Sequence, residues 1–398
     1  MNILEGIRTV DQLDVENKRV FVRVDFNVPM EDGRITDDTR IREALSTIEA
    51  LRAKGAKVVL GSHLGRPKPG KRDGLSLVPV GERLAELAGV EVHVPDDCVG
   101  KTAQKVIFDL RPGQICLLEN LRFHEEEEKN DEAFARELAA LADAYVCDAF
   151  GALHRAHASV HALPRMFRER AAGHLVMKEI SSLGRLLESR EHPYVAVLGG
   201  AKVSDKITVI EALLERCDAI LIGGAMANTF LAAKGLNMQK SLVETEKLPL
   251  ARTLIDKAAA RRVELLLPTD FIVGASIKAT EGQVVAANAV PEGTMALDIG
   301  PDSVAAFAAK TKDAALVFWN GPMGLFEQPA FSSGTFGLAK ALTECTGFTV
   351  VGGGDSAAAV HAAGGDIASK FGHISTGGGA SLELIEGKKL PGIEALRP

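Results

Sequence analysis

Short apolar runs alternate with polar loops and amphipathic helices along almost the whole chain, and this alternation restricts the fold more than any other feature. Val20–Asp25 is an apolar run typical of a buried strand, and a polar loop follows it. A helix is expected from Thr39, because apolar residues recur at helical spacing from Ile41 to Leu51. Strand, loop and helix in series predict parallel sheets with helices on both faces.

The pattern occurs twice, which predicts an α/β protein with two Rossmann-like, doubly wound parallel-sheet lobes. The strands expected in the first lobe are Val20–Asp25, Lys57–Leu60, Val90–Val94, Ile115–Leu118 and Tyr145–Cys147. Those expected in the second are Tyr194–Leu198, Ala219–Ile222, Val263–Leu267, Ala315–Trp319 and Phe348–Val351. We expect an N-terminal lobe over residues 1–175, a connecting helix over 176–190, a C-terminal lobe over 191–380 and a final segment over 381–398.

Charge and hydropathy restrict the binding partners that can be expected for this chain. The net charge of −7 argues against nucleic acid, because a phosphate backbone is bound by clustered positive surface. The N-terminus has acidic residues where a signal peptide needs an apolar core, and no apolar run approaches the length that spans a bilayer. We therefore expect a cytoplasmic protein with no membrane partner.

The five cysteines are scattered without C-x-x-C spacing. They are typical of small buried apolar residues in a reducing compartment, so neither a disulfide nor a structural zinc ion is expected. These residues are Cys98, Cys116, Cys147, Cys217 and Cys345.

A glycine-rich turn, Gly352–Gly354, separates the last expected strand from a helix that opens near Ala357. Glycines let backbone N–H groups approach a ligand, and a helix N-terminus favours negative charge, so the turn suits phosphate. The negative charge of Asp355 would repel a phosphate group. It fits an anion site only if a divalent cation, as in a magnesium nucleotide complex, lies between the carboxylate and the phosphates. The alternative is that Asp355 or Ser356 is only a helix N-cap.

The same stretch fits the dinucleotide fingerprint G-x-G-x-x-A through Gly352, Gly354 and Ala357. That fingerprint requires a second strand that ends in an acidic residue about twenty positions later. The residues that follow are glycine-rich and lack a strand-like apolar run. A mononucleotide is therefore the better prediction.

Cationic and polar residues follow several strands of the first lobe. In parallel α/β sheets ligands bind outside the carboxyl ends of the strands, so these loops should meet at one edge. Guanidinium groups there suit bidentate capture of phosphate or carboxylate, which predicts a small polyanion as ligand. We assign no role to the acidic run Glu125–Glu128, which is typical of a solvated face. The loop residues are Asp25, Asn27, Arg40, His63, Arg66, Arg122, His154, Arg155 and His157.

Lys202 and Lys206 lie four residues apart at the expected start of a helix in the second lobe. Cations oppose the dipole at a helix N-terminus, so an anionic ligand explains them better than helix stability does. Glu327 lies in a glycine-punctuated loop after Ala315–Trp319, where it could bind a ribose hydroxyl or be simply exposed.

Taken together, these motifs resemble those of the phosphoglycerate kinase family. They are RVDFNVP, DDTRI, SHLGRP, ENLRF, HRAH, LGGAKVSDK, NGPMGLFE, GGGDS and STGGGAS, in that order from Val20 to the C-terminus. The resemblance implies reversible phosphoryl transfer between 1,3-bisphosphoglycerate and ADP, giving 3-phosphoglycerate and ATP. It also implies two Rossmann-like lobes, a C-terminal segment that returns to the first lobe, and a monomer.

By motif position the resemblance implies two sites. The phosphoglycerate site would comprise Asp25, Asn27, Arg40, His63, Arg66, Arg122 and Arg155. The nucleotide site would comprise Lys202, Lys206, Glu327, Gly353, Gly354, Asp355 and Ser356, with Mg²⁺ on Asp355. Ala152, Leu153 and Ser356 depart from the residues common in the family, whereas the hydroxyl at position 356 and every charged position are kept.

For the chemistry, we expect Arg40 and Lys202 to flank the transferred group, in a cleft between the lobes that closes about a hinge. Two alternative functions are a dinucleotide-dependent dehydrogenase and a non-catalytic, two-lobed anion-binding protein. The first leaves Lys202 and Lys206 unexplained, and the second needs no carboxylate for magnesium.

Overall fold

The computed structural model describes residues 3–68, 70, 72 and 74–398. The chain forms two compact units. Unit 1 comprises Met1–Ser181 and Lys389–Pro398, and unit 2 comprises Ser182–Lys388. The helix α5 (His174–Glu188) contains the boundary between them.

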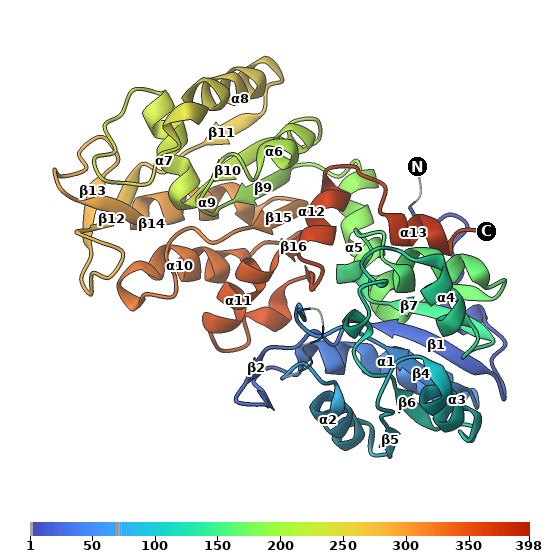
Figure 1. Ribbon diagram of the computed structural model, residues 1–398. Coiled ribbons are helices and arrows are strands. Elements are labelled where there is room, and N and C mark those ends of the chain that lie inside the picture. Colours follow the sequence, from blue (N-terminus) through green and yellow to red (C-terminus); the bar gives the residue numbers. More distant parts are fainter. Residues whose placement is uncertain (1–2, 69, 71, 73) are drawn as a thin grey trace. The chain divides into compact units, whose positions relative to one another are not determined.

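Unit 1 is built on a six-stranded parallel sheet with the order β5-β6-β4-β1-β7-β8 (Figure 1). Nearly every residue of the central strands is buried, which explains their unbroken apolar sequences. A two-stranded antiparallel ribbon, β2 and β3, follows β1. The strands are β1 (Arg19–Val24), β2 (Met30–Glu31), β3 (Arg34–Ile35), β4 (Lys57–Gly61), β5 (Val92–His93), β6 (Ile115–Leu117), β7 (Ala144–Asp148) and β8 (Arg170–Ala172).

Four α-helices alternate with the strands of unit 1. On α1 the residues Ile41, Ile48 and Leu51 are buried against the valines of β1 and β4, as their helical spacing predicts. The helix α2 ends at Gly89, whose φ of 64° is the left-handed conformation that favours glycine. The helices are α1 (Thr39–Ala53), α2 (Val78–Ala88), α3 (Gly100–Phe108) and α4 (Glu132–Ala139).

The end of the chain packs on unit 1 through the short helix α13 (Pro391–Leu396) (Figure 1). The Gly392 N–H donates to the Leu153 carbonyl over 2.9 Å, and a Cβ on Gly392 would collide with the Leu153 side chain. The Arg397 guanidinium donates to backbone carbonyls of residues 3 and 5. These bonds join the two ends of the described chain within one unit.

Unit 2 has its own six-stranded parallel sheet, with the order β11-β10-β9-β15-β16-β17. On one face Val195 and Trp319 pack with Phe307, Leu338 and Val360 from three successive helices. The strands are β9 (Tyr194–Leu198), β10 (Ala219–Ile222), β11 (Glu264–Leu266), β15 (Leu316–Asn320), β16 (Phe348–Gly352) and β17 (His373–Ile374). The helices are α6 (Ile207–Leu213), α7 (Gly224–Ala233), α8 (Leu248–Ala260), α9 (Pro301–Lys312), α10 (Ser333–Leu342), α11 (Gly354–Ala362) and α12 (Gly379–Ile385).

The predicted fold class, α/β with two parallel sheets, is confirmed. The sequence did not predict the three-stranded antiparallel sheet of unit 2, whose strands are β12 (Asp270–Gly274), β13 (Gln283–Ala286) and β14 (Met295–Ile299). The strand expected over Val90–Val94 is only Val92–His93. Across the described residues, no helix has both the length and the apolar character that crossing a membrane requires.

Candidate functional site

The loops that carry the predicted residues of unit 1 leave the same edge of its sheet. They follow β6, β4, β1 and β7, which are neighbours in this order in the sheet and all run parallel. The sheet order reverses direction at β1, where the chain continues to β4 on one side and later to β7 on the other. Such a switch point is where open α/β sheets bind ligands.

Asp25 and Arg40 form an ion pair at this edge of the sheet. Arg40 lies in the first turn of α1, and Asp25 Oδ1 lies 4.0 Å from His63 Nδ1. Burial alone would raise the pKa of Asp25, but Arg40, His63 and Arg23 outweigh it and lower that pKa. The Arg40 side chain keeps 35% of its surface exposed, so the guanidinium can still meet a ligand.

Asn27 and Arg122 fix the loop that carries Arg66. The Gly65 N–H donates to Asn27 Oδ1 over 2.8 Å, and Arg122 Nη1 donates to the Gly65 carbonyl over 2.8 Å. Arg66 itself is exposed. The backbone of the loop is therefore held by residues that follow two different strands, while the arginine remains accessible to solvent.

Arg23 is a buried cation that the sequence analysis missed. Its Nε donates to Ser159 Oγ over 2.7 Å and its Nη2 lies 3.2 Å from His63 Nδ1. Burial, together with the nearby Arg23, Arg122 and Arg40, holds the pKa of His63 well below its ordinary value, against the opposing effect of Asp25. His63 is therefore neutral near pH 7. The signal for Arg23 was an arginine inside an otherwise apolar strand.

The interpretation of the acidic run Glu125–Glu128 as a solvated face is wrong for Glu127, although Glu125, Glu126 and Glu128 are exposed. Glu127 is fully buried and accepts hydrogen bonds from both the backbone N–H and the hydroxyl of Ser159. Glu128 lies 3.3 Å from Arg122 Nε. Glu127 thus provides, through Ser159, the negative charge behind Arg23, because a buried charge requires a compensating partner.

His154, Arg155 and His157 complete the edge after β7. Arg155 Nε donates to His154 Nε2 over 3.2 Å. Burial, followed by Arg122, Arg23 and Arg155, lowers the pKa of His157 to about 4. The charges of these arginines thus add to burial in disfavouring a positive charge on His157.

In unit 2 the glycine turns after three strands pack directly against one another. Gly199 follows β9, Gly321 follows β15 and Gly224 begins α7 after β10. A Cβ on Gly199 would collide with the carbonyls of Gly321 and Pro322, and one on Gly224 with the backbone of Gly200. Only glycine permits this approach, which brings backbone groups to the switch point between β9 and β15.

The turn after β16 supplies a helix N-terminus. Gly353 is the N-cap of α11, with φ at 94°, and Asp355 and Ser356 lie inside the first helical turn without a capping hydrogen bond. The alternative that Asp355 or Ser356 is only an N-cap is therefore wrong. Ser356 is buried, and its Oγ accepts a hydrogen bond from the Gly321 N–H over 2.6 Å. Asp355 is exposed.

Lys206 is close enough to Asp355 for their charges to interact. Burial lowers the pKa of Lys206 to about 8, although Asp355 and Asp205 oppose the shift. Lys206 is the N-cap residue of α6, whereas Lys202 and Glu327 are exposed. A partly buried ammonium that is not fully compensated favours an anionic ligand.

Two parallel α/β units, each with cations at the carboxyl edge of its sheet, define a class of enzyme that binds small, highly charged reactants. Comparison with known proteins narrows this class. The family model for phosphoglycerate kinase matches residues 10–388. The chain belongs to the phosphoglycerate kinase family, which confirms the predicted family and enzyme class. The comparisons do not support the dehydrogenase or the non-catalytic alternative.

Individual relatives agree along nearly the full length. The chain is 56% identical to a phosphoglycerate kinase of Anaeromyxobacter sp. (strain Fw109-5), over 98% of this chain and 99% of that protein. It is also 56% identical to one of Moorella thermoacetica, over 98% of each. A solved phosphoglycerate kinase structure from Coxiella burnetii matches with a TM-score of 0.88 and 39% identity, over 98% of each chain.

Proposed function

We propose that the protein catalyses reversible phosphoryl transfer between 1,3-bisphosphoglycerate and ADP, giving 3-phosphoglycerate and ATP. The observation that carries this proposal within the molecule is the excess of positive charge at the sheet edge of unit 1. There burial, followed by the charges of Arg122, Arg23 and Arg155, lowers the pKa of His157 to about 4. A phosphorylated carboxylic acid supplies the negative charge that such an edge lacks.

The phosphoglycerate site comprises Asp25, Asn27, Arg40, His63, Arg66, Arg122 and Arg155. In this site the arginines bind phosphate and carboxylate oxygens, and Asp25 orients Arg40 through their ion pair. His63 acts as a neutral hydrogen-bonding group, because its pKa lies well below the ordinary value. In the ATP-consuming direction the nucleophile is a carboxylate, which is ionised near pH 7 and needs no general base.

The nucleotide site comprises Lys202, Lys206, Glu327, Gly353, Gly354, Asp355 and Ser356. Lys206 and the N-terminus of α11 bind phosphate oxygens. Ser356 holds the Gly321 turn against α11 through its hydrogen bond. Glu327 accepts a hydrogen bond from a ribose hydroxyl.

Asp355 would hold Mg²⁺, which when bound neutralises charge on the nucleotide phosphates. Magnesium is usually bound by one or two carboxylates together with substrate phosphates, and a single exposed carboxylate in the first turn of α11 fits this donor set.

The rate depends on charge neutralisation and on alignment of the two anions. Arg40 and Lys202 flank the transferred group, and hinge bending brings the reactants into line and excludes water. The candidate hinge elements are Gly377–Gly379 and Val176–Leu187. The protein works as a monomer in the cytoplasm, where its unpaired cysteines stay reduced.

A coupled assay with magnesium ATP and 3-phosphoglycerate tests this function, and Arg40→Ala tests its mechanism. We expect kcat to fall on the order of 10³-fold or more, while the Kd for ATP stays unchanged. Arg42→Ala is the matched control, because Arg42 lies on the same helix and pairs with Asp38 on the surface. Equal turnover by Arg40→Ala and the native protein would remove Arg40 from the mechanism.

A further inference from the structure

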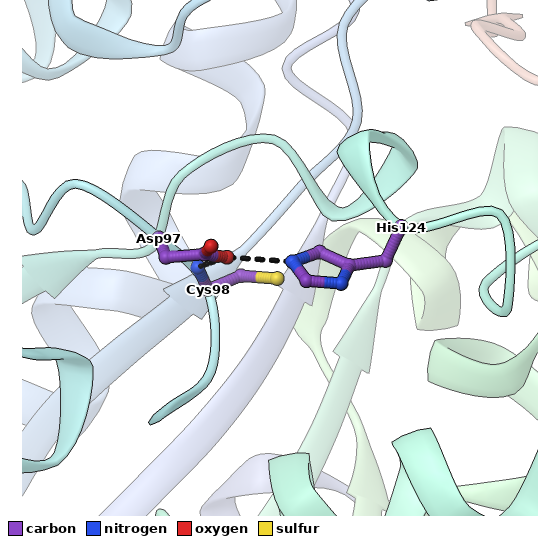
Figure 2. Close-up of side chains that lie close together, drawn as sticks. All are labelled: Asp97, Cys98 and His124. Atoms are coloured by element: carbon purple, nitrogen blue, oxygen red, sulfur yellow. Dashed lines mark hydrogen bonds and ion pairs between the residues drawn. The ribbon is translucent and has the colours of Figure 1, made fainter. Parts of the chain in front are cut away.

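Three side chains with metal-ligating atoms, none of which has a role in the proposed reaction, meet in unit 1. Asp97 and Cys98 lie in the loop between β5 and α3, and His124 is the residue that ends the 3-10 turn η2 (Leu121–Phe123). Figure 2 shows the imidazole of His124 turned toward the carboxylate of Asp97, with the Cys98 sulfur beside both. One carboxylate oxygen, the Sγ and one ring nitrogen all lie within 4.8 Å of one another.

The three groups differ in exposure in a way that suits entry of an ion. Cys98 is fully buried, whereas the side chains of Asp97 and His124 are 33% and 25% exposed. The sulfur therefore lies on the buried side of the cluster, and the carboxylate and the imidazole lie on the side that contacts water. The His124 ring is also stacked on Phe134, with centroids 5.2 Å apart, which restricts the plane of the imidazole.

Both oxygens of the Asp97 carboxylate have partners, and Oδ1 is the one that faces the His124 ring. Arg72 Nη2 lies 3.3 Å from Oδ2, and His124 Nε2 lies 2.6 Å from Oδ1, which also accepts from the Cys98 N–H. Around a tetrahedral zinc ion, with bonds near 2.1 Å, a nitrogen and an oxygen ligand would be about 3.4 Å apart. The imidazole and Oδ1 thus need to separate by less than about 1 Å.

We propose that Asp97, Cys98 and His124 form a zinc-binding site with water as the fourth ligand. Thiolate, imidazole and carboxylate are the three donor types that Zn²⁺ takes in proteins, and three protein ligands with one open position is a common arrangement. The soft sulfur ligand selects Zn²⁺ over Mg²⁺ and Ca²⁺, which prefer sets of oxygen atoms.

The Cys98 thiol is buried close to the charges of Asp97 and Glu127. Burial, followed by the charges of Asp97 and Glu127, raises the pKa of Cys98 well above its ordinary value. Arg72 is the nearby cation that compensates Asp97. When Zn²⁺ binds, a zinc–sulfur bond forms and the thiol proton passes to solvent, so the ion neutralises the thiolate and carboxylate together.

The site would join two segments that are distant in sequence. His124 follows η2, which contains Arg122, while Asp97 and Cys98 precede α3. Bound zinc would therefore restrain the loop after β6 against the loop after β5. Because zinc binds the folded site and has no preformed site in the unfolded chain, it should raise the denaturation midpoint of the full protein.

The test uses the full chain, freed of metal by a chelator and dialysed against Zn²⁺ in excess Mg²⁺. One equivalent of zinc should be retained, and Co²⁺ in its place should give a sulfur-to-cobalt charge-transfer band. Cys98→Ser, His124→Gln and Asp97→Asn should each lose stoichiometric binding and the rise in midpoint.

Cys345→Ser is the matched control, because it removes a free thiol that lies outside the cluster. If Cys98→Ser fails to fold, the partly exposed Asp97 and His124 variants and the cobalt spectrum of the native protein still decide the matter. The proposal is overturned if the native protein retains no zinc, if the cobalt spectrum lacks the thiolate band, or if folded His124→Gln binds as the native protein does.

Discussion

The depressed pKa of Lys206 predicts that nucleotide affinity falls as pH rises through about 8. Burial lowers the pKa of this ammonium group to about 8 in the free protein. A bound polyphosphate stabilises the protonated form, so the pKa is higher in the complex and binding above pH 8 takes up a proton. Only the charged form binds phosphate well, and the affinity therefore decreases toward alkaline pH.

The size of the effect follows from the protonated fraction of Lys206. That fraction is about nine tenths at pH 7 and about one tenth at pH 9. Because the apparent Kd is the intrinsic Kd divided by the competent fraction, it should rise about 10-fold between these pH values. The phosphates of the nucleotide titrate near pH 6 and contribute little over this range.

Titration calorimetry with magnesium ATP at pH 7, 8 and 9 measures the dependence. Lys206→Arg should bind with an affinity that barely changes with pH, because a guanidinium stays charged throughout. Lys240→Arg, an exposed lysine of the same unit, should keep the native profile. A flat profile in the native protein, or an unchanged slope in Lys206→Arg, would refute the proposed role of Lys206.

Two further predictions concern the buried network and the hinge. Glu127→Gln removes the charge behind Ser159 and Arg23, so urea denaturation should show a free energy of unfolding lower by about 1–3 kcal/mol. The exposed Glu126→Gln should leave the midpoint unchanged, and equal midpoints for both variants would contradict the account of Glu127. Hinge bending predicts a smaller radius of gyration in X-ray scattering when both substrates are bound, and no compaction with both present would argue against it.

The strands were predictable where both faces are buried. Tyr194–Leu198 is an unbroken apolar run, and the structure has a strand with the same bounds. The antiparallel strand β13 (Gln283–Ala286) was not predictable in this way, because most of its residues are exposed and its pairing is set by β12. Short, exposed strands of this kind form because they pair with an adjacent strand, and the local sequence does not show that pairing.

The limits of the site prediction have a similar cause. The sequence suggested the arginines and histidines after several strands of the first lobe, because residue type and position relative to the strand suffice for that. It could not distinguish Glu127 from Glu126, since four consecutive glutamates give no periodicity and burial of Glu127 depends on Ser159, 32 residues away. Likewise, spacing rules for metal ligands could not connect Cys98 with His124.

The central claim is that each unit binds one of the two anionic reactants. Calorimetric titration of 3-phosphoglycerate and of magnesium ATP into Arg155→Ala and Lys206→Ala tests it most directly. The account predicts that Arg155→Ala weakens only 3-phosphoglycerate binding and that Lys206→Ala weakens only nucleotide binding. Weakening of both ligands by either variant, or the opposite pairing of variant and ligand, would contradict it.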